Sequence, residues 1–309
     1  MTFQQLEYIV AVDNNRHFVK AATACGVTQS TLSTTISKLE QEIDVVIFDR
    51  SKHPIEPTPL GKQIIGQARV ILHNSQQLRE LVQTEKDSDM GNLFIGIIPS
   101  VAPYLYPAIA RSMRVSSPNL YMTVTEAFSE PLIDKLQRSE LDMAIVSSSE
   151  IKDTNLYEIE LYTERFMLYV SPSSMLWQRE WLRPEDLHDG GMWAMRAFHD
   201  HYPQLADITH CETFHHTTFA SGTLRTLIDL VNTNGGYTIV PELFRTVLSA
   251  EEQKNLRPIQ GPKFFRTVSL VIRGDYLRER MLNAMTDAIK AVIPREIHSR
   301  WLQRDHITL

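Results

Sequence analysis

Apolar positions in the first 58 residues recur at the spacing of an α-helix. The clearest stripe follows an i, i+4, i+7, i+11 pattern and consists of Leu32, Ile36, Leu39 and Ile43, with polar residues on its other side. Before it, Gly26 suits a left-handed exit from a preceding helix, and Thr28 offers a hydroxyl that caps the next helix. Helix, short turn with glycine, and helix together predict a helix-turn-helix.

The pattern changes after this segment. Residues 51–59 contain three prolines and predict an exposed loop, or wing. Residues 60–86 then carry a 3.5-residue repeat of mostly apolar positions, which favours a partner helix, most simply a second copy of itself. An intramolecular packing face is the alternative. The apolar members of this repeat, which we assign to a dimer interface, are Ile64, Ala68, Ile71, Leu78 and Val82.

From residue 92 onward, short apolar runs alternate with helical patterns. This alternation predicts α/β structure with parallel sheets, over a segment long enough for two lobes. The predicted strands are 93–98, 120–125, 143–146, 166–170, 237–240 and 268–272. The predicted helices between or after them include 102–113, 131–137, 223–231 and 276–292.

Composition narrows the class of protein. The chain has 309 residues, 43% hydrophobic and 22% charged, with a net charge of −6, which is an ordinary globular composition. No apolar run approaches the roughly 20 residues of a membrane helix, and the first residues lack the pattern of a signal peptide. Its two cysteines, Cys25 and Cys211, fit a reducing compartment. We therefore expect a soluble, cytoplasmic protein.

The N-terminal motifs resemble those of the LysR-type transcriptional regulators. The resemblance covers the first sixty residues without a gap, and the order of elements matches beyond them. It rests on Leu6-Glu7, Phe18, Ala21-Ala22, 27–33, Ile36, Leu39-Glu40, 47–50 and 58–61. Within the family, the chain most resembles the peroxide-sensing branch. This resemblance rests on residues 16–18, Cys25 and residues 96–105.

The resemblance implies an α+β multidomain fold. It comprises an N-terminal winged helix-turn-helix, a long linker helix, and a C-terminal two-lobed α/β domain like a periplasmic binding protein. The expected DNA-binding domain is 1–58, the linker and dimerisation helix 59–88, and the effector-sensing domain 89–309. Lobe I would comprise about 91–163 and 267–309, and lobe II about 164–266.

DNA recognition is expected from the second helix of the motif, whose N-terminal residues lie on base edges in the major groove. Gln29 begins this helix, and its amide can pair with adenine. Residues 1–58 carry five Lys/Arg and seven Asp/Glu, so we expect weak binding by one head and dependence on avidity. The expected DNA contacts are Gln29, Ser30, Thr31, Ser33, Thr34, Lys38, Lys52, His53 and Thr58.

The second domain is expected to hold a small effector between its lobes, because ligands of open α/β sheets sit beyond the carboxyl ends of strands. Hydroxyls at helix starts and one arginine are the candidates, although each hydroxyl could equally be a helix cap. The expected effector contacts are Ser100, Val101, Ser129, Ser147, Arg196, His199, Ser221 and Thr223.

Redox and metal chemistry remain as alternatives. The resemblance aligns His199 with a histidine that precedes the reactive cysteine of the peroxide-sensing branch, but no cysteine follows it here. A disulfide within one sensor domain is therefore excluded, and a one-thiol response through Cys211 stays open. Residues 199–216 contain five histidines, which could bind metal, sense pH or form a solvated loop. The metal candidates are His199, His201, His210 and Cys211. We expect no cofactor.

An enzyme or a solute-binding protein built on the α/β part is the competing class. We find no P-loop, no Gly-x-Gly-x-x-Gly, no Gly-x-Ser-x-Gly and no His-Glu-x-x-His motif. A regulator explains all three segments of the chain. The expected partners are double-stranded DNA with an interrupted inverted repeat, a small effector, and further copies of the chain in a dimer of dimers. RNA polymerase is a further possible partner, and no membrane is expected.

Overall fold

A computed structural model describes the chain over residues 1–84, 91–148, 155–187, 191–193, 223–261, 264–276, 278–300 and 302–303. The chain divides into two compact units. The first, residues 1–88 with 134–141, contains the N-terminal head and the long helix that follows it. The second contains the α/β domain. In the described part, no helix is both long enough and apolar enough to cross a bilayer.

The head is a three-helix unit with a short two-stranded wing. Its strands β1 and β2 pair antiparallel, with Phe48 opposite Pro57. The predicted helix-turn-helix is therefore present, and the predicted wing connects the two strands. The elements are α1 (Phe3–Asn15), α2 (Phe18–Ala24), α3 (Gln29–Ile43), β1 (Phe48–Asp49), β2 (Glu56–Pro57) and α4 (Pro59–Thr84).

The turn between α2 and α3 forms as the sequence predicts. Gly26 has a φ of +67°, which is the left-handed region that a side chain disfavours. The Thr28 hydroxyl accepts a hydrogen bond from the Thr31 backbone N–H at 3.2 Å and caps α3. Leu32, Ile36 and Leu39 are fully buried in the head core, so the opposite face of α3 is turned outward.

The start of α4 is fastened to the head. The Thr58 hydroxyl donates to the Val46 carbonyl at 2.8 Å and accepts from the Gly61 N–H at 2.9 Å. Gly61 lies so close to β1 that a Cβ built on it would be 2.1 Å from the Ile47 carbonyl oxygen. The helix is thus held where only a glycine fits.

The predicted dimer stripe on α4 divides into two parts. Ala68 is buried in the core of its own head and Ile64 packs against that core, so the intramolecular alternative holds for these two residues. One subunit already buries Ala68, so this residue contributes to packing within the subunit. Farther along, Ile71 and Leu78 remain 39% and 59% exposed. The side chain of Val82 lies outside the described residues.

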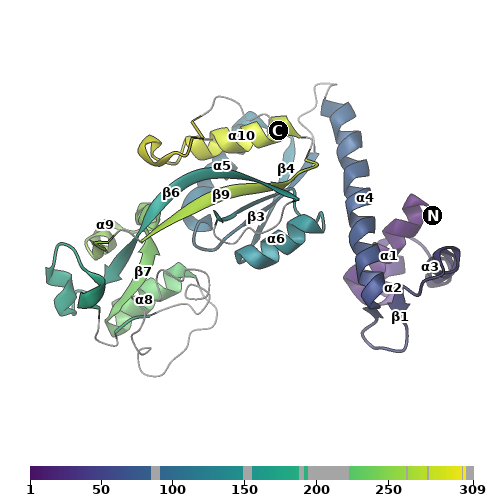
Figure 1. The fold of residues 1–309 in the computed structure, drawn as a ribbon, viewed down its shortest axis with the longest axis horizontal. Helices are drawn as coiled ribbons and strands as arrows, with labels where there is room; N and C mark the ends of the chain where they lie inside the picture. The colour runs from purple at the N-terminus through teal and green to yellow at the C-terminus, as the bar shows by residue number, and fades with distance from the viewer. Residues whose placement is uncertain are drawn as a thin grey trace. The chain divides into compact units, whose positions relative to one another are not determined.

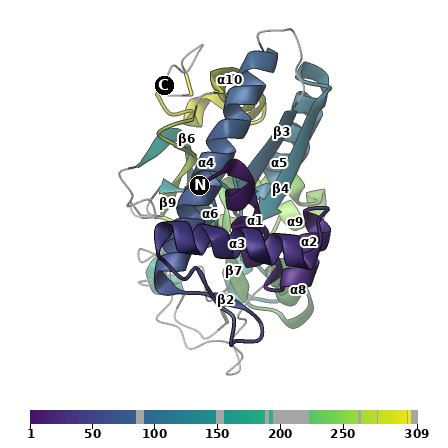
Figure 2. The same ribbon diagram turned by 90° about the vertical axis from the view of Figure 1, so that its right-hand side faces the viewer.

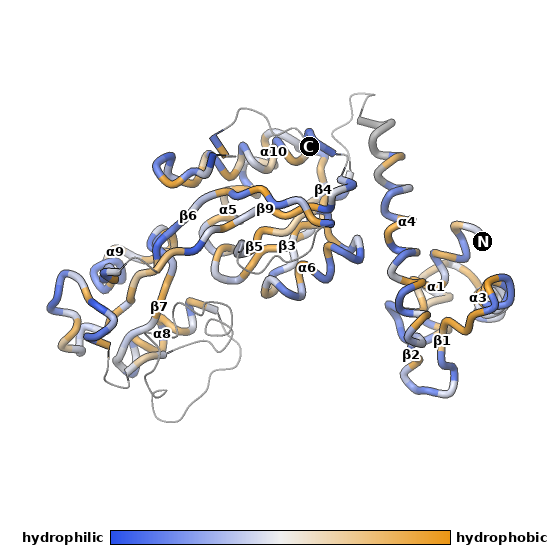
Figure 3. The backbone as a smooth tube through the Cα atoms, in the orientation of Figure 1, coloured by the Kyte–Doolittle hydropathy of each residue, from blue (hydrophilic) through white to orange (hydrophobic). Residues whose placement is uncertain are grey.

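The second unit is built on a seven-stranded sheet with the strand order β4-β3-β5-β9-β6-β7, in which β8 also pairs with β6. In the view of Figure 1, α10 lies above the long strands and α6 below them. Strands β3 and β5 are largely hydrophobic along their length (Figure 3). The strands are β3 (Gly91–Ile97), β4 (Leu120–Glu126), β5 (Met143–Ser147), β6 (Leu156–Val170), β7 (Tyr237–Pro241), β8 (Leu256–Pro258) and β9 (Phe265–Arg273).

Helices and short 3-10 turns connect these strands. Helix α5 follows β3, and the 3-10 turn η6 follows β7. The longer helices are α5 (Ala102–Ser116), α6 (Ser129–Gln137), α8 (Leu224–Asn234) and α10 (Glu279–Lys290). The short ones are α9 (Ala250–Gln253), η2 (Met175–Gln178), η3 (Pro184–Asp186), η6 (Glu242–Val247) and η7 (Arg295–Ile297).

The prediction of parallel sheets was only partly right. The pairs β3–β4 and β3–β5 are parallel. By contrast, β9 pairs antiparallel with β5 and β6, and β6 pairs antiparallel with β7 and β8. The reason is that β6 and β9 are long neighbouring strands that run in opposite directions between the two ends of the sheet (Figure 1).

The 15-residue strand β6 joins two lobes. Its first part, Leu156 to Arg165, pairs with β9, and its last part, from Phe166, pairs with β7 and β8. We call the side with β3, β4, β5 and α5 lobe I, and the side with β7, β8, α8 and η6 lobe II. The change of partners after Arg165 marks the crossover between them.

Candidate functional site

The outward face of α3 is the candidate DNA-reading surface. Gln29, Ser30, Thr31, Thr34 and Lys38 are exposed, and Ser33 is partly exposed. Figure 2 shows α3 in front of the rest of the head, with its long side toward the viewer. The expected base-reading residues therefore share one accessible face, while the apolar face anchors the helix in the core.

Arg50 adds a cation to this face that the sequence reasoning did not assign to DNA. Its guanidinium donates to the Ser37 hydroxyl at 3.0 Å and pairs with Glu40 at 2.9 Å. It also lies 3.4 Å from the Ser33 hydroxyl and stacks over the Phe18 ring. The other oxygen of Glu40 accepts from the Ile47 backbone N–H at 2.8 Å. This network fixes the end of β1 against α3. In the sequence, the only indication of a role for Arg50 was its position at the end of a motif shared with the family.

The wing offers fewer free charges than the sequence implied. Lys52 and His53 are exposed as expected. The Lys52 ammonium, however, donates to Glu56 at 2.5 Å, and this contact raises the pKa of Lys52 and lowers the pKa of Glu56. Thr58 uses its hydroxyl as the clamp between β1 and α4 described above. The one lysine of the wing is therefore paired within the head.

In lobe I, three of the expected effector contacts lie at one edge of the sheet. The parallel register sets Ile97 opposite Glu126 and Ile145, so these strands end at the same edge. Ser100 follows β3, Ser129 follows β4, and Ser147 is the last residue of β5. All three serines, and Val101, are buried. The topology gathers these residues at the edge where open α/β sheets bind ligands.

Ser100 is already engaged within the protein. Its hydroxyl accepts a hydrogen bond from Arg266 at 2.6 Å, and Arg266 in turn pairs with Glu164 at 2.7 Å. The side chains of Arg266 and Glu164 are both 0% exposed. The Tyr104 hydroxyl donates to Glu164 at 2.9 Å. Burial, together with the charge of Glu164, raises the pKa of Tyr104 well above its ordinary value. The phenol therefore remains a hydrogen-bond donor throughout the neutral range.

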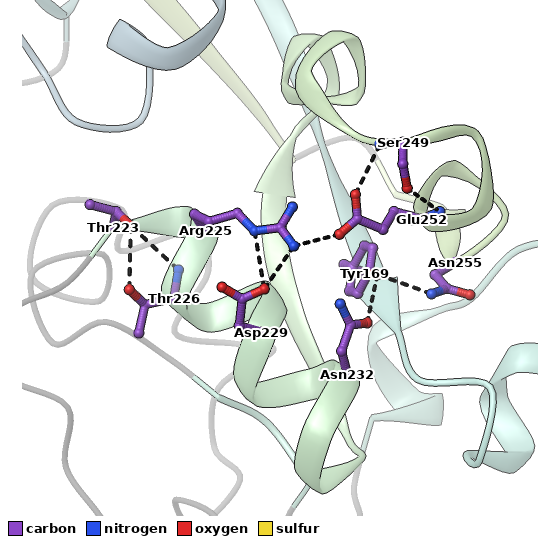
Figure 4. A network of polar contacts seen from close by, with 9 residues as sticks. All are labelled: Tyr169, Thr223, Arg225, Thr226, Asp229, Asn232, Ser249, Glu252 and Asn255. Atoms are coloured by element: carbon purple, nitrogen blue, oxygen red, sulfur yellow. Dashed lines mark hydrogen bonds and ion pairs between the residues drawn. The ribbon is translucent and has the colours of Figure 1, made fainter.

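In lobe II, Thr223 is a helix cap. Its hydroxyl accepts from the Thr226 N–H at 3.3 Å, which is the alternative that the sequence left open. Nearby, Arg225 on α8 bridges Asp229 and Glu252 at 2.7 and 2.6 Å (Figure 4). The hydrogen bond from Arg225 lowers the pKa of Glu252.

A second group in Figure 4 centres on Tyr169 of β6. Its hydroxyl donates to Asn232 at 2.8 Å and accepts from Asn255 at 3.0 Å. Together with the Arg225–Glu252 pair, these contacts hold α8 and α9 against the sheet of lobe II.

The remaining candidates lie outside the described residues: Arg196, His199, His201, His210, Cys211 and Ser221. Across the described ranges, no group of three or more His, Cys, Asp or Glu side chains is arranged to hold a metal ion.

Comparison with known proteins places both units in one family. Residues 3–62 match the family model of the bacterial regulatory helix-turn-helix protein, lysR family, and residues 86–294 match that of the LysR substrate binding domain. The second match alone spans more than half of the chain. The prediction of a regulator, made against an enzyme or a solute-binding protein, agrees with both matches.

Individual relatives agree along the whole chain. The chain is 32% identical to the hydrogen peroxide-inducible genes activator of Haemophilus influenzae, over 95% of this chain and 99% of that protein. It is 30% identical to the DNA-binding transcriptional dual regulator OxyR of Escherichia coli, over 94% and 95% of the two chains. The structure of a full-length OxyR variant from Pseudomonas aeruginosa matches with a TM-score of 0.81 at 29% identity, covering 97% of this chain and 98% of that one. The chain therefore belongs to the LysR family of DNA-binding transcriptional regulators and carries that family's effector-binding domain.

Proposed function

We propose that α3 reads the operator through Gln29 and Ser33, with Ser30, Thr31, Thr34 and Lys38 contacting neighbouring bases or phosphates. The observation that carries this proposal is the division of α3 into an accessible polar face and an apolar face locked in the core. The N-terminal turn of the recognition helix in a helix-turn-helix lies on base edges. Arg50 joins these residues as a phosphate contact, because its guanidinium lies beside Ser33 and Ser37.

Replacing Gln29 with alanine tests this assignment. We expect the variant to lose about 1–3 kcal/mol of discrimination between the operator and a scrambled site, because the bidentate amide contact to adenine is removed. Competition gel shifts measure this difference. Gln41→Ala is the matched control, since Gln41 is exposed at the far end of α3. Equal discrimination by wild type and Gln29→Ala would remove Gln29 from the reading face.

The assembly that we propose is a dimer through α4 that binds an interrupted inverted repeat, with two dimers associating through their effector domains. The exposed residues Ile71 and Leu78 support the first contact, because residues seven apart lie on the same side of a helix. Residues 1–58 carry five Lys/Arg against seven Asp/Glu, so tight binding is expected to need the second half-site.

The signal that we propose is a small effector that acts at the serine-lined edge of lobe I and changes DNA binding or bending. The burial of Ser100, Ser129 and Ser147 at the carboxyl ends of parallel strands supports this location. RNA polymerase would then receive the signal on the promoter.

The names of the curated relatives favour one specific alternative, a response to peroxide. Cys211 is the only cysteine after the head, so such a response would use one thiol of each subunit. Under our main proposal, Cys211→Ser binds the operator as wild type does, with and without peroxide. If wild type responds to peroxide and Cys211→Ser does not, the alternative replaces the small-effector proposal.

A further inference from the structure

A buried carboxylate sits at the crossover between the two lobes. Glu164 lies two residues before β6 changes its partners, and Arg266 lies directly opposite it on β9. Neither side chain reaches solvent. Charged side chains are rarely placed in such surroundings without a specific arrangement of partners.

The partners of Glu164 come from both lobes. Its Oε1 accepts from the Tyr104 hydroxyl of α5, in lobe I, at 2.9 Å. Its Oε2 accepts from the backbone N–H of Leu243 in η6, in lobe II, at 3.1 Å. One carboxylate therefore connects a helix that follows β3 to a turn that follows β7.

The ion pair between Arg266 and Glu164 constrains the geometry of this connection. Arg266 donates to Oε1 of Glu164 through both Nε and Nη2, at 2.9 and 2.7 Å. Its Nη1 donates to the Ser100 hydroxyl at 2.6 Å. A guanidinium binds in a fixed planar fork, so a change in the position of any one partner disturbs the others. The pair therefore constrains the orientation of the two lobes as well as holding them together.

We propose that Glu164 is a positioning residue that sets the arrangement of the two lobes through its contacts with Arg266, Tyr104 and Leu243. We call these four residues the latch. Ser100, which binds Arg266, couples the latch to the edge of lobe I. The coupling to Ser100 rests on the proposed function, because that edge is where we place the effector. The latch itself needs neither effector nor DNA. A ligand that takes the Ser100 hydroxyl from Arg266 would loosen the same contacts that hold lobe II.

The distance between the lobes tests the proposal. Spin labels are attached to Val115→Cys in lobe I and Met175→Cys in lobe II, in the full chain with Cys25→Ser and Cys211→Ser. Both label positions are well exposed, at 79% and 86%. An excess of unlabelled chains ensures that pulsed electron paramagnetic resonance measures distances within one subunit, without DNA.

We expect a narrow distance distribution for the parent chain. In Glu164→Gln, which cannot pair with Arg266 as a charge, we expect the distribution to widen at least twofold or its mean to shift. The control is Glu252→Gln, which breaks an ion pair that lies within lobe II. It is expected to lower the melting temperature but leave the interlobe distribution unchanged, a difference that a merely stabilising role for Glu164 would not produce.

A folded Glu164→Gln with the parent distribution would overturn the proposal. If Glu164→Gln does not fold, Tyr104→Phe decides, because it removes one bond to Glu164 and keeps the ion pair. Widening in Tyr104→Phe supports the latch, and an unchanged distribution refutes it. Operator binding is measured separately, so a failure of DNA recognition would contradict the proposed function without affecting this result.

Discussion

Ile71→Asp is expected to split the dimer and to lower the operator affinity at least 100-fold. Ile71 is 39% exposed on α4, and Leu78, seven residues later, is 59% exposed. In a dimer through α4, these two side chains would pack against the second copy and be removed from water. A carboxylate at position 71 would then be buried without a partner. A single head then loses the avidity of the second half-site, which is worth a factor of about 10² to 10⁴.

Sedimentation velocity measures the split, and gel shifts on operators with one or two half-sites measure the affinity. Gln76→Asp is the matched control, because it places the same charge on the same helix about 140° away from Ile71 around the axis. It should remain dimeric. An Ile71→Asp protein that sediments as the wild type would refute the assignment of this face to the dimer.

Gly61→Ala is expected to destabilise the head by about 1–3 kcal/mol, the usual cost of forcing an extra carbon into a packed site. A Cβ at this position would be 2.1 Å from the Ile47 carbonyl oxygen and 2.9 Å from the Thr58 hydroxyl oxygen. The nearest obstacle is backbone, which has no rotamer to change. The junction between β1 and α4 must therefore shift, and the Thr58 clamp with it.

Hydrogen exchange in α1 to α3 reports this loss. The four tryptophans are all in the second unit, at 177, 181, 193 and 301, so their fluorescence should remain that of the wild type. The control is Gly66→Ala, where nothing lies within 4 Å of the added carbon and alanine should stabilise α4 by about 0.5–1 kcal/mol. Wild-type exchange in Gly61→Ala would show that the head tolerates the added carbon.

Local signals in the sequence predicted the head well. Gly26, Thr28 and the stripe from Leu32 to Ile43 each act within a few residues of their position, so caps, turn and buried face follow directly from them. Arg50 was missed as part of the reading face because its partners, Ser37 and Glu40, come from an earlier helix. The resemblance marked the position without indicating where its side chain goes.

Long-range pairing limited the prediction of the second unit. Only 166–170 of β6 was predicted, because there both faces are buried and the apolar run is continuous. The first part carries acidic residues, and the buried Glu164 pairs with Arg266, which lies 102 residues later in the chain. The antiparallel pairing of β6 with β9 and the hydrogen bond from Arg266 to Ser100 also depend on residues that are far apart in the sequence.

Photocrosslinking from α3 shows which surface of the protein contacts the operator. A benzophenone side chain is introduced at position 29, or at position 41 as the control, and the full chain is irradiated on DNA from upstream of its own gene. We expect covalent adducts with operator bases from position 29 and none from position 41. Operator that is bound and retarded, yet forms no adduct from position 29, would show that a different surface of the protein contacts the double helix.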